Sequence, residues 1–207
     1  MQHRPLAQLL TRAESCYKIW SQQHARSVSL LITLSNVVAQ RTAATANSNN
    51  DAFESIDTSR LVYKQSLAFE SIIDNLNRVV DGLESILFDL QKLESDAAKW
   101  VTKETATTIK SREPAPLSTE TLIQVAAIQP HDVHRYIADV LHMLRKDFEN
   151  KQTWIDELPL HSSRPEQLED LIQQWDQQTH VRRELVEEMS ERIKLYKQVY
   201  KVVTSTD

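Results

Sequence analysis

The feature that most constrains this chain is an unbroken apolar repeat between Phe69 and Trp100. Its positions recur in alternating steps of three and four residues: Phe69, Ile72, Leu76, Val79, Leu83, Ile86, Leu90, Leu93, Ala97 and Trp100. This spacing places them on one face of an α-helix for more than four heptads. Ile73, Val80 and Leu87 add a third apolar column, so the face is wider than the seam of a two-stranded coil. The pattern predicts a long helix packed among several others.

Turn-forming residues are scarce in the rest of the chain. Glycine occurs once, at Gly82, and proline six times in 207 residues. Sheets joined by tight turns and glycine-rich phosphate loops both use several glycines. Charged residues make up 26 % and hydrophobic residues 41 % of the chain, which is ordinary for a folded soluble protein. The composition therefore favours an all-α class and argues against a phosphate-loop nucleotide enzyme.

Apolar periodicity also sets the expected helix bounds. Long helices are predicted at about residues 5–41, 55–102, 130–158 and 163–203, with flexible loops at 42–52 and 104–117. Ser118 to Ile128 is predicted as a short helix, Pro159 as the end of the third long helix, and Ser163 to Glu166 as a capping box. Polar residues from Asp176 to His180 predict a bend or break in the last helix.

The short link between the third and fourth long helices requires that they be antiparallel neighbours. The expected fold is all-α: an elongated antiparallel helical bundle, or coiled coil, of about four long helices. We expect it to form a single helical domain over residues 1–207.

No group of residues suggests catalysis. His131, His134 and His142 share a helix face, but zinc needs three or four convergent ligands and no Glu-x-x-His pair is present. Cys16 is the only cysteine, which excludes an internal disulfide and fits a reducing compartment. On an amphipathic helix such a thiol is more often buried filler than a nucleophile. We therefore expect no catalytic residues, no cofactor, no metal and no enzyme activity.

Charge and hydropathy limit the classes of partner. The net charge of −5 argues against electrostatic binding of nucleic acid by the whole chain. The most apolar stretch, Val28 to Ala39, is too short and too polar to span a bilayer, and no secretory signal is evident. We expect protein partners, without direct contact to nucleic acid or membrane.

Four tryptophans and one glycine leave alternatives open. Trp20, Trp100, Trp154 and Trp175 lie on or beside apolar stripes, so bundle core is the default, although tryptophan is also enriched at binding hot spots. Gly82 lies inside a predicted helix, where glycine costs about 1 kcal/mol relative to alanine. Either a close helix–helix approach offsets this cost, or the glycine has no structural role.

A set of short motifs resembles a known family. Val140-Leu-His-Met-Leu-Arg-Lys-Asp147, followed by Lys151, Thr153 and Glu157-Leu158, is similar to the Leu-x-Met-x-Arg-Lys-acid, Lys-x-Thr and Glu-Leu positions of the cyclin-dependent kinase 2-interacting protein family. Val80-Asp-Gly-Leu83, Lys92-Leu93, Trp20 with Asn36, and Trp175 resemble the same layout, although the N-terminal spacing departs by a few residues. A related helical factor, which works with a AAA ATPase in ribosome maturation, has similar Arg-Lys, Lys and tryptophan positions.

Both resemblances imply a non-enzymatic adaptor in the nucleus, with the cytoplasm as the alternative. The first implies DNA replication, its checkpoint and contacts with cyclin-dependent kinases. The second implies ribosome maturation, and both point to an assembly that recruits AAA ATPases. A structural coiled-coil subunit is a further alternative.

The residues predicted to bind a partner are Arg145, Lys146, Lys151 and Trp175. The three basic side chains are expected to point outward or sideways and to orient an acidic partner surface. The competing interpretation is that they pair with acids such as Asp147 and Glu149 or with a neighbouring helix.

Replacing Leu83 or Leu90 with aspartate should collapse the helical fold. An unpaired buried charge costs several kcal/mol, a large part of a total stability of about 5–15 kcal/mol. Thermal melting followed by circular dichroism measures the loss, and an unchanged melting curve would contradict the bundle.

Overall fold

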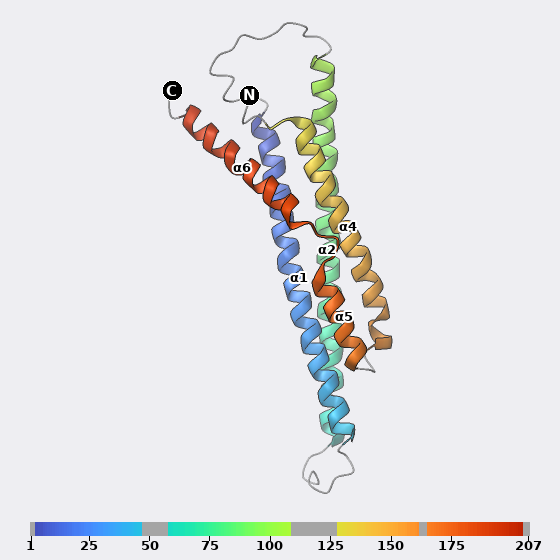
Figure 1. Ribbon diagram of the computed structural model, residues 1–207. Helices are drawn as coiled ribbons and strands as arrows, with labels where there is room; N and C mark the ends of the chain where they lie inside the picture. Colours follow the sequence, from blue (N-terminus) through green and yellow to red (C-terminus); the bar gives the residue numbers. More distant parts are fainter. Residues whose placement is uncertain (1–2, 47–57, 109–127, 162–164, 205–207) are drawn as a thin grey trace. The chain divides into compact units, whose positions relative to one another are not determined.

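The computed structural model describes residues 3–46, 58–108, 128–161 and 165–204. Its described elements are all α-helices: α1 (His3–Ala46), α2 (Thr58–Thr108), α4 (Pro130–His161), α5 (Pro165–Gln177) and α6 (Arg183–Thr204) (Figure 1). No strand occurs among these described residues. The prediction of an all-α fold is therefore confirmed.

The helices contribute to two compact units. Unit 1 lies within residues 1–19, 85–146 and 180–207, and unit 2 within residues 20–84 and 147–179. Helices α1, α2 and α4 each give one segment to both units, whereas α5 belongs to unit 2 and α6 to unit 1. Successive described segments within each unit run antiparallel (Figure 1). The single folding domain over residues 1–207 stays a prediction.

Each unit packs around its own segment of the apolar stripe of α2. Eight of the ten repeat positions are buried, while Phe69 and Trp100 at its ends are half-buried. The core of unit 2 is an apolar cluster of Leu31, Leu34, Val38, Ile72, Leu76, Leu158, Leu168, Leu171 and Trp175. The core of unit 1 includes Leu6, Leu10, Ala13, Leu90, Leu93, Val133, Ile137, Leu144, Met189 and Ile193. Burying each large aliphatic side chain contributes about 1.5–3 kcal/mol, so the stripe stabilises both units.

The described helices run further than predicted. Residues 42–46 were predicted as loop but complete α1, where the Thr42 hydroxyl donates to the Val38 carbonyl at 3.0 Å and the Thr45 hydroxyl to the Arg41 carbonyl at 2.8 Å. Alanines 43, 44 and 46 are strong helix formers, so this polar composition does not break the helix. Residues 47–52, the rest of the predicted loop, lie outside the described part.

Two further helix ends differ from the prediction. Helix α2 continues to Thr108, beyond the predicted end at 102, because no glycine or proline interrupts it there. Helix α4 continues to His161 with Pro159 inside its last turn. A proline so close to the end removes only one terminal hydrogen bond of the helix. Residues 109–127 and Ser163 of the capping box lie outside the described residues.

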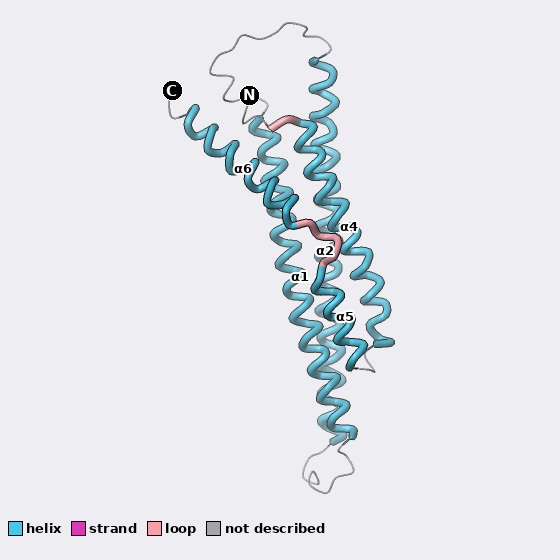
Figure 2. The backbone as a smooth tube through the Cα atoms, viewed as in Figure 1, coloured by secondary structure: helices cyan, strands magenta, loops and turns pink. Residues whose placement is uncertain are grey.

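The predicted fourth long helix is two helices. Helix α5 ends at Gln177 and α6 begins at Arg183, with a loop between them (Figure 2). Gln178 has a φ of 42°, the left-handed conformation that commonly ends a helix. The predicted break between Asp176 and His180 is thus present.

Gly82 does not mark a close approach of two helices. A Cβ atom at this position would lie 3.8 Å from Cδ of Gln23, an ordinary van der Waals distance. Of the two interpretations of this glycine, the one without a structural role fits this spacing.

Gly82→Ala should stabilise the protein by about 0.5–1 kcal/mol, because alanine loses less backbone entropy in a helix. The melting temperature should rise by about 1–4 °C for a chain of this size. Differential scanning calorimetry measures the shift. A lower melting temperature would indicate that the helices pack more closely around residue 82 than this distance allows.

Candidate functional site

A buried polar cluster joins α1, α4 and α5 inside unit 2. Trp175 is fully buried, and its indole Nε1–H donates a hydrogen bond of 2.7 Å to the Ser27 hydroxyl. That hydroxyl donates in turn to the His24 carbonyl at 2.6 Å. Trp154 packs against Trp175 with ring centroids 5.9 Å apart. The indole is therefore held both by apolar packing and by a specific donor–acceptor pair, which sets the position of α5 on α1.

Lys151 and Asp147 form an ion pair within the same cluster. The Lys151 ammonium lies 3.0 Å from both carboxylate oxygens of Asp147, and the two side chains are 0 % and 3 % exposed. The ammonium also lies 5.0 Å from the centre of the Trp175 ring, in range of a cation–π contact. Burial lowers the pKa of Lys151, an effect that Asp147 opposes. The carboxylate and the ring thus favour the charged ammonium inside the unit.

His24 completes the cluster on α1. It is buried, and its Nε2 lies 3.7 Å from the Asp176 carboxylate. Burial lowers the pKa of His24, and the positive charge of Lys151 lowers it further, against the opposite effects of Asp147 and Asp176. At neutral pH the imidazole is therefore neutral. The cluster as a whole orients three helices, and burial keeps His24, Lys151 and Asp147 from contact with a solute.

The structure separates the four predicted partner-binding residues. Arg145 and Lys146 are exposed on the part of α4 that belongs to unit 1. Lys151 and Trp175 are fully buried in unit 2. Lys151 points inward and pairs with Asp147, as the competing interpretation predicted, so the outward or sideways orientation is wrong for this residue. Its position gives the reason, since Leu144, Phe148 and Lys151 follow the apolar stripe of α4 in steps of four and three.

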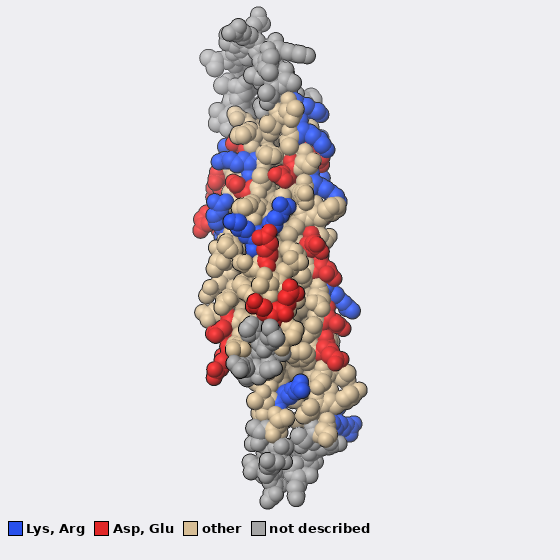
Figure 3. All heavy atoms as spheres, turned by 90° about the vertical axis from the view of Figure 1, so that its right-hand side faces the viewer, with Lys and Arg blue, Asp and Glu red and all other residues tan. Residues whose placement is uncertain are grey.

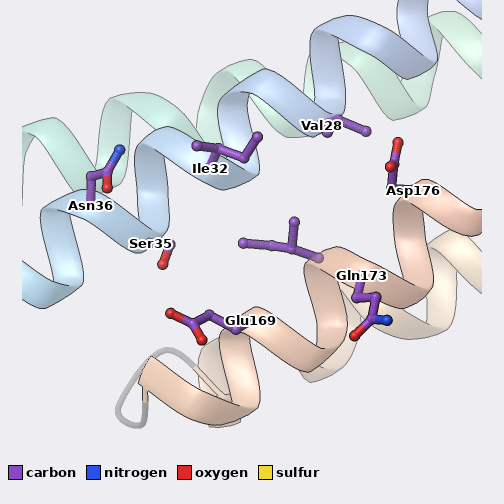
Figure 4. A pocket seen from close by; sticks show the side chains of 8 residues that line it. Val28, Ile32, Ser35, Asn36, Glu169, Gln173 and Asp176 are labelled. Atoms are coloured by element: carbon purple, nitrogen blue, oxygen red, sulfur yellow. The ribbon is translucent and has the colours of Figure 1, made fainter.

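A groove lies between α1 and α5, and the sequence analysis did not predict it. It encloses about 330 Å³ and is lined by Val28, Ile32, Ser35, Asn36, Glu169, Ile172, Gln173 and Asp176. Figure 4 shows the labelled α1 residues on one side of this space and the labelled α5 residues on the other. Ile32 is 49 % exposed within the groove. The sequence signal for this groove is Ile32, an isoleucine between Leu31 and Leu34 that lies one step off the stripe that α1 buries.

Other reactive groups do not assemble into a site in the described part of the chain. Burial raises the pKa of the Cys16 thiol, and Asp89 raises it further, so its reactive thiolate form is disfavoured. Among the described residues, no three histidine, cysteine or acidic side chains are placed to hold one metal ion. None of the described helices combines the length and the apolar character needed to cross a membrane.

A family model described as "Ribosome biogenesis protein C1orf109-like" matches residues 2–192. The chain belongs to this family. The matched range includes α1, α2, α4, α5 and the beginning of α6, so it takes in the buried polar cluster and the groove. No curated protein sequence matches the chain.

Family membership decides between the two resemblances. It agrees with the second, to a helical factor of ribosome maturation, and places the chain among ribosome biogenesis proteins. It does not support the first resemblance, to the cyclin-dependent kinase 2-interacting protein family, or the replication and cell-cycle roles that it implied.

Lys151→Met should destabilise unit 2 by about 3–5 kcal/mol, because it leaves the Asp147 carboxylate buried without its partner. Adding Asp147→Leu should recover much of the loss, since the double variant has no buried charge at this place. Urea unfolding followed by circular dichroism measures both changes.

Lys99→Met is the matched control. Lys99 forms an exposed pair with Asp96 at 2.8 Å, and exposed pairs contribute about 0–1 kcal/mol. Equal losses in the Lys99 and Lys151 variants would show that the buried pair has no special role.

Proposed function

We propose that this protein acts in ribosome biogenesis as a non-enzymatic helical adaptor that connects a AAA ATPase to its pre-ribosomal substrate. The observation that carries the proposal is membership of a ribosome biogenesis family over residues 2–192. A AAA ATPase is proposed as the partner because Arg145, Lys146 and the tryptophan positions resemble those of a helical factor that works with such an ATPase. The proposed location is the nucleus.

The burial of the clustered polar side chains in unit 2 supports an adaptor rather than an enzyme. A catalytic site needs several polar groups converging on a space that a substrate can enter. In unit 2 the clustered polar groups are His24, Ser27, Asp147 and Lys151, and all four are buried. The Ser27 hydroxyl joins α1 to Trp175 of α5, and the Lys151–Asp147 pair lies within α4 with its ammonium against the Trp175 ring. These groups therefore serve the packing of helices, as a scaffold for partner binding requires.

The charge distribution supports protein partners. Basic and acidic side chains are interspersed on the face drawn in Figure 3. A nucleic-acid binder typically gathers lysine and arginine on one face or along one helix. Exposed Arg145 and Lys146 fit the smaller role of orienting an acidic protein surface, where charge mainly determines specificity and association rate.

The proposed function is tested in cells that lack the protein. Sucrose gradients should show pre-ribosomal particles accumulating and mature subunits falling, and re-expression of the protein should restore the profile. A normal profile in cells without the protein would overturn the proposal.

Arg145→Ala with Lys146→Ala should leave the free energy of unfolding within about 1 kcal/mol, as exposed substitutions usually do. The double variant should capture less of the AAA ATPase from nuclear extract, and the loss should be largest at low salt, where exposed charges are least screened. Immunoblotting of the captured ATPase measures the effect.

The control removes two other exposed charges from unit 1. Lys92 and Lys99 lie on α2 and are each more than half exposed, so Lys92→Ala with Lys99→Ala changes the net charge equally. Equal losses of capture in the two double variants would exclude a specific role for Arg145 and Lys146.

A further inference from the structure

We infer that the groove between α1 and α5 of unit 2 binds a basic amphipathic helix of a partner protein. The inference rests on the proposed adaptor function and names the chemistry of one partner segment. The apolar lining of the groove, its length and the charge around it lead to this occupant.

The groove has an apolar centre. Val28 and Ile172 are half-buried against the core of unit 2, and Ile32 is 49 % exposed. Within unit 2, the core residues of α1 include Leu31, Leu34 and Val38, so Ile32 is an apolar residue beyond those that fill the core, and Val28 is only half covered by it. Single exposed apolar residues are common on protein surfaces, but here apolar residues from two helices line the same space.

The dimensions of the groove suit two turns of a helix. Its α1 side runs from Val28 to Asn36 and its α5 side from Glu169 to Asp176, which is roughly 11–12 Å at 1.5 Å per residue. Two anchors four residues apart on a partner helix lie about 6 Å apart along its axis. A volume of about 330 Å³ can take such anchors, and a groove between two helices is a common seat for the apolar face of a third.

The charge around the groove selects a basic partner. Helix α5 carries Glu166, Glu169, Asp170 and Asp176 and has no lysine or arginine. The α1 wall faces it with the uncharged stretch Ser27 to Gln40. The lining itself contains two acidic residues, Glu169 and Asp176, and no basic one. Asp176 lies near His24, but its side chain remains 66 % exposed. Lysine or arginine flanking the apolar anchors would complement these carboxylates, whereas the phosphates of RNA would be repelled.

The test begins with an unbiased set of peptides. Random 16-residue peptides displayed on phage are first depleted on the immobilised Ile32→Asp variant and then selected on the full chain. The expected peptides have apolar residues four positions apart and an excess of lysine and arginine. Recovery of no peptide, or of acidic or uncharged peptides, would overturn the inference.

Binding of the best synthetic peptide is then measured by fluorescence anisotropy. Ile32→Asp and Glu169→Lys should each weaken binding about tenfold or more, because one charges the apolar centre and the other reverses a rim charge. Glu169 is exposed, so its variant tests the groove even where Ile32→Asp perturbs folding.

Each variant has a matched control. Ile19 lies on α1 outside the groove and is 47 % exposed, close to Ile32, and Asp170 is the exposed neighbour of Glu169 that does not line the groove. Ile19→Asp and Asp170→Lys should weaken binding less than about threefold, since neither residue touches the proposed occupant. Equal losses in variants and controls would overturn the inference.

Two further measurements separate other outcomes. Light scattering that shows a dimer of this chain, lost in Glu169→Lys, would assign the groove to a second copy and overturn the inference. Capture of the AAA ATPase by the full chain tests the adaptor function separately. Capture without peptide binding would reject the groove alone, whereas groove-specific peptide binding without capture would reject the proposed ATPase adaptor function alone.

Discussion

The structure depends on the need to cover one apolar stripe along its whole length. Helix α2 carries this stripe from Phe69 to Trp100, and its segments lie in both compact units. A helix with so wide an apolar face cannot remain exposed to water, because each large side chain loses about 1.5–3 kcal/mol of burial energy when solvated. Helices α1 and α4 each supply a segment to both units, and the covering is completed by α5 in one unit and α6 in the other.

The buried polar groups of unit 2 favour one alignment of its helices, which apolar packing alone does not do. Leucine stripes tolerate sliding by a turn, since one apolar residue replaces another in the same place. The hydrogen bond from Trp175 on α5 to Ser27 on α1 has no such substitute, and neither has the contact of the Lys151 ammonium on α4 with the Trp175 ring. A shift of α5 along α1 would leave the buried indole N–H without its acceptor, which costs more than the bond contributes, whereas the Lys151–Asp147 pair lies within α4 and would persist. We infer that these contacts select one arrangement of the helices.

The sequence predicted the parts of the fold that follow from periodicity. Leu83 and Leu90 are fully buried as their spacing required, and the break after α5 occurs at the polar residues around Gln178. The helix ends were missed because composition is a weak guide to where a helix stops. The polarity of residues 42–46 predicts a loop, but their alanines favour helix and their threonine hydroxyls donate hydrogen bonds to helix carbonyls. The charge of Lys151 alone predicts an exposed side chain, whereas its spacing from Leu144 and Phe148 predicts the inward direction that is observed.

The groove could not be predicted, because it depends on which helix lies beside α1. Periodicity identifies Leu31 and Leu34 as inward residues, and it leaves Ile32 as an unexplained apolar neighbour. Only the position of α5 reveals that Ile32 shares its surface with Ile172 and with two carboxylates. For the proposed adaptor function, apolar residues that the core does not need are more informative than the core itself, since core residues are already accounted for by folding. The acidic charge of α5 beside them is the reason for proposing a basic partner, because it disfavours an acidic one.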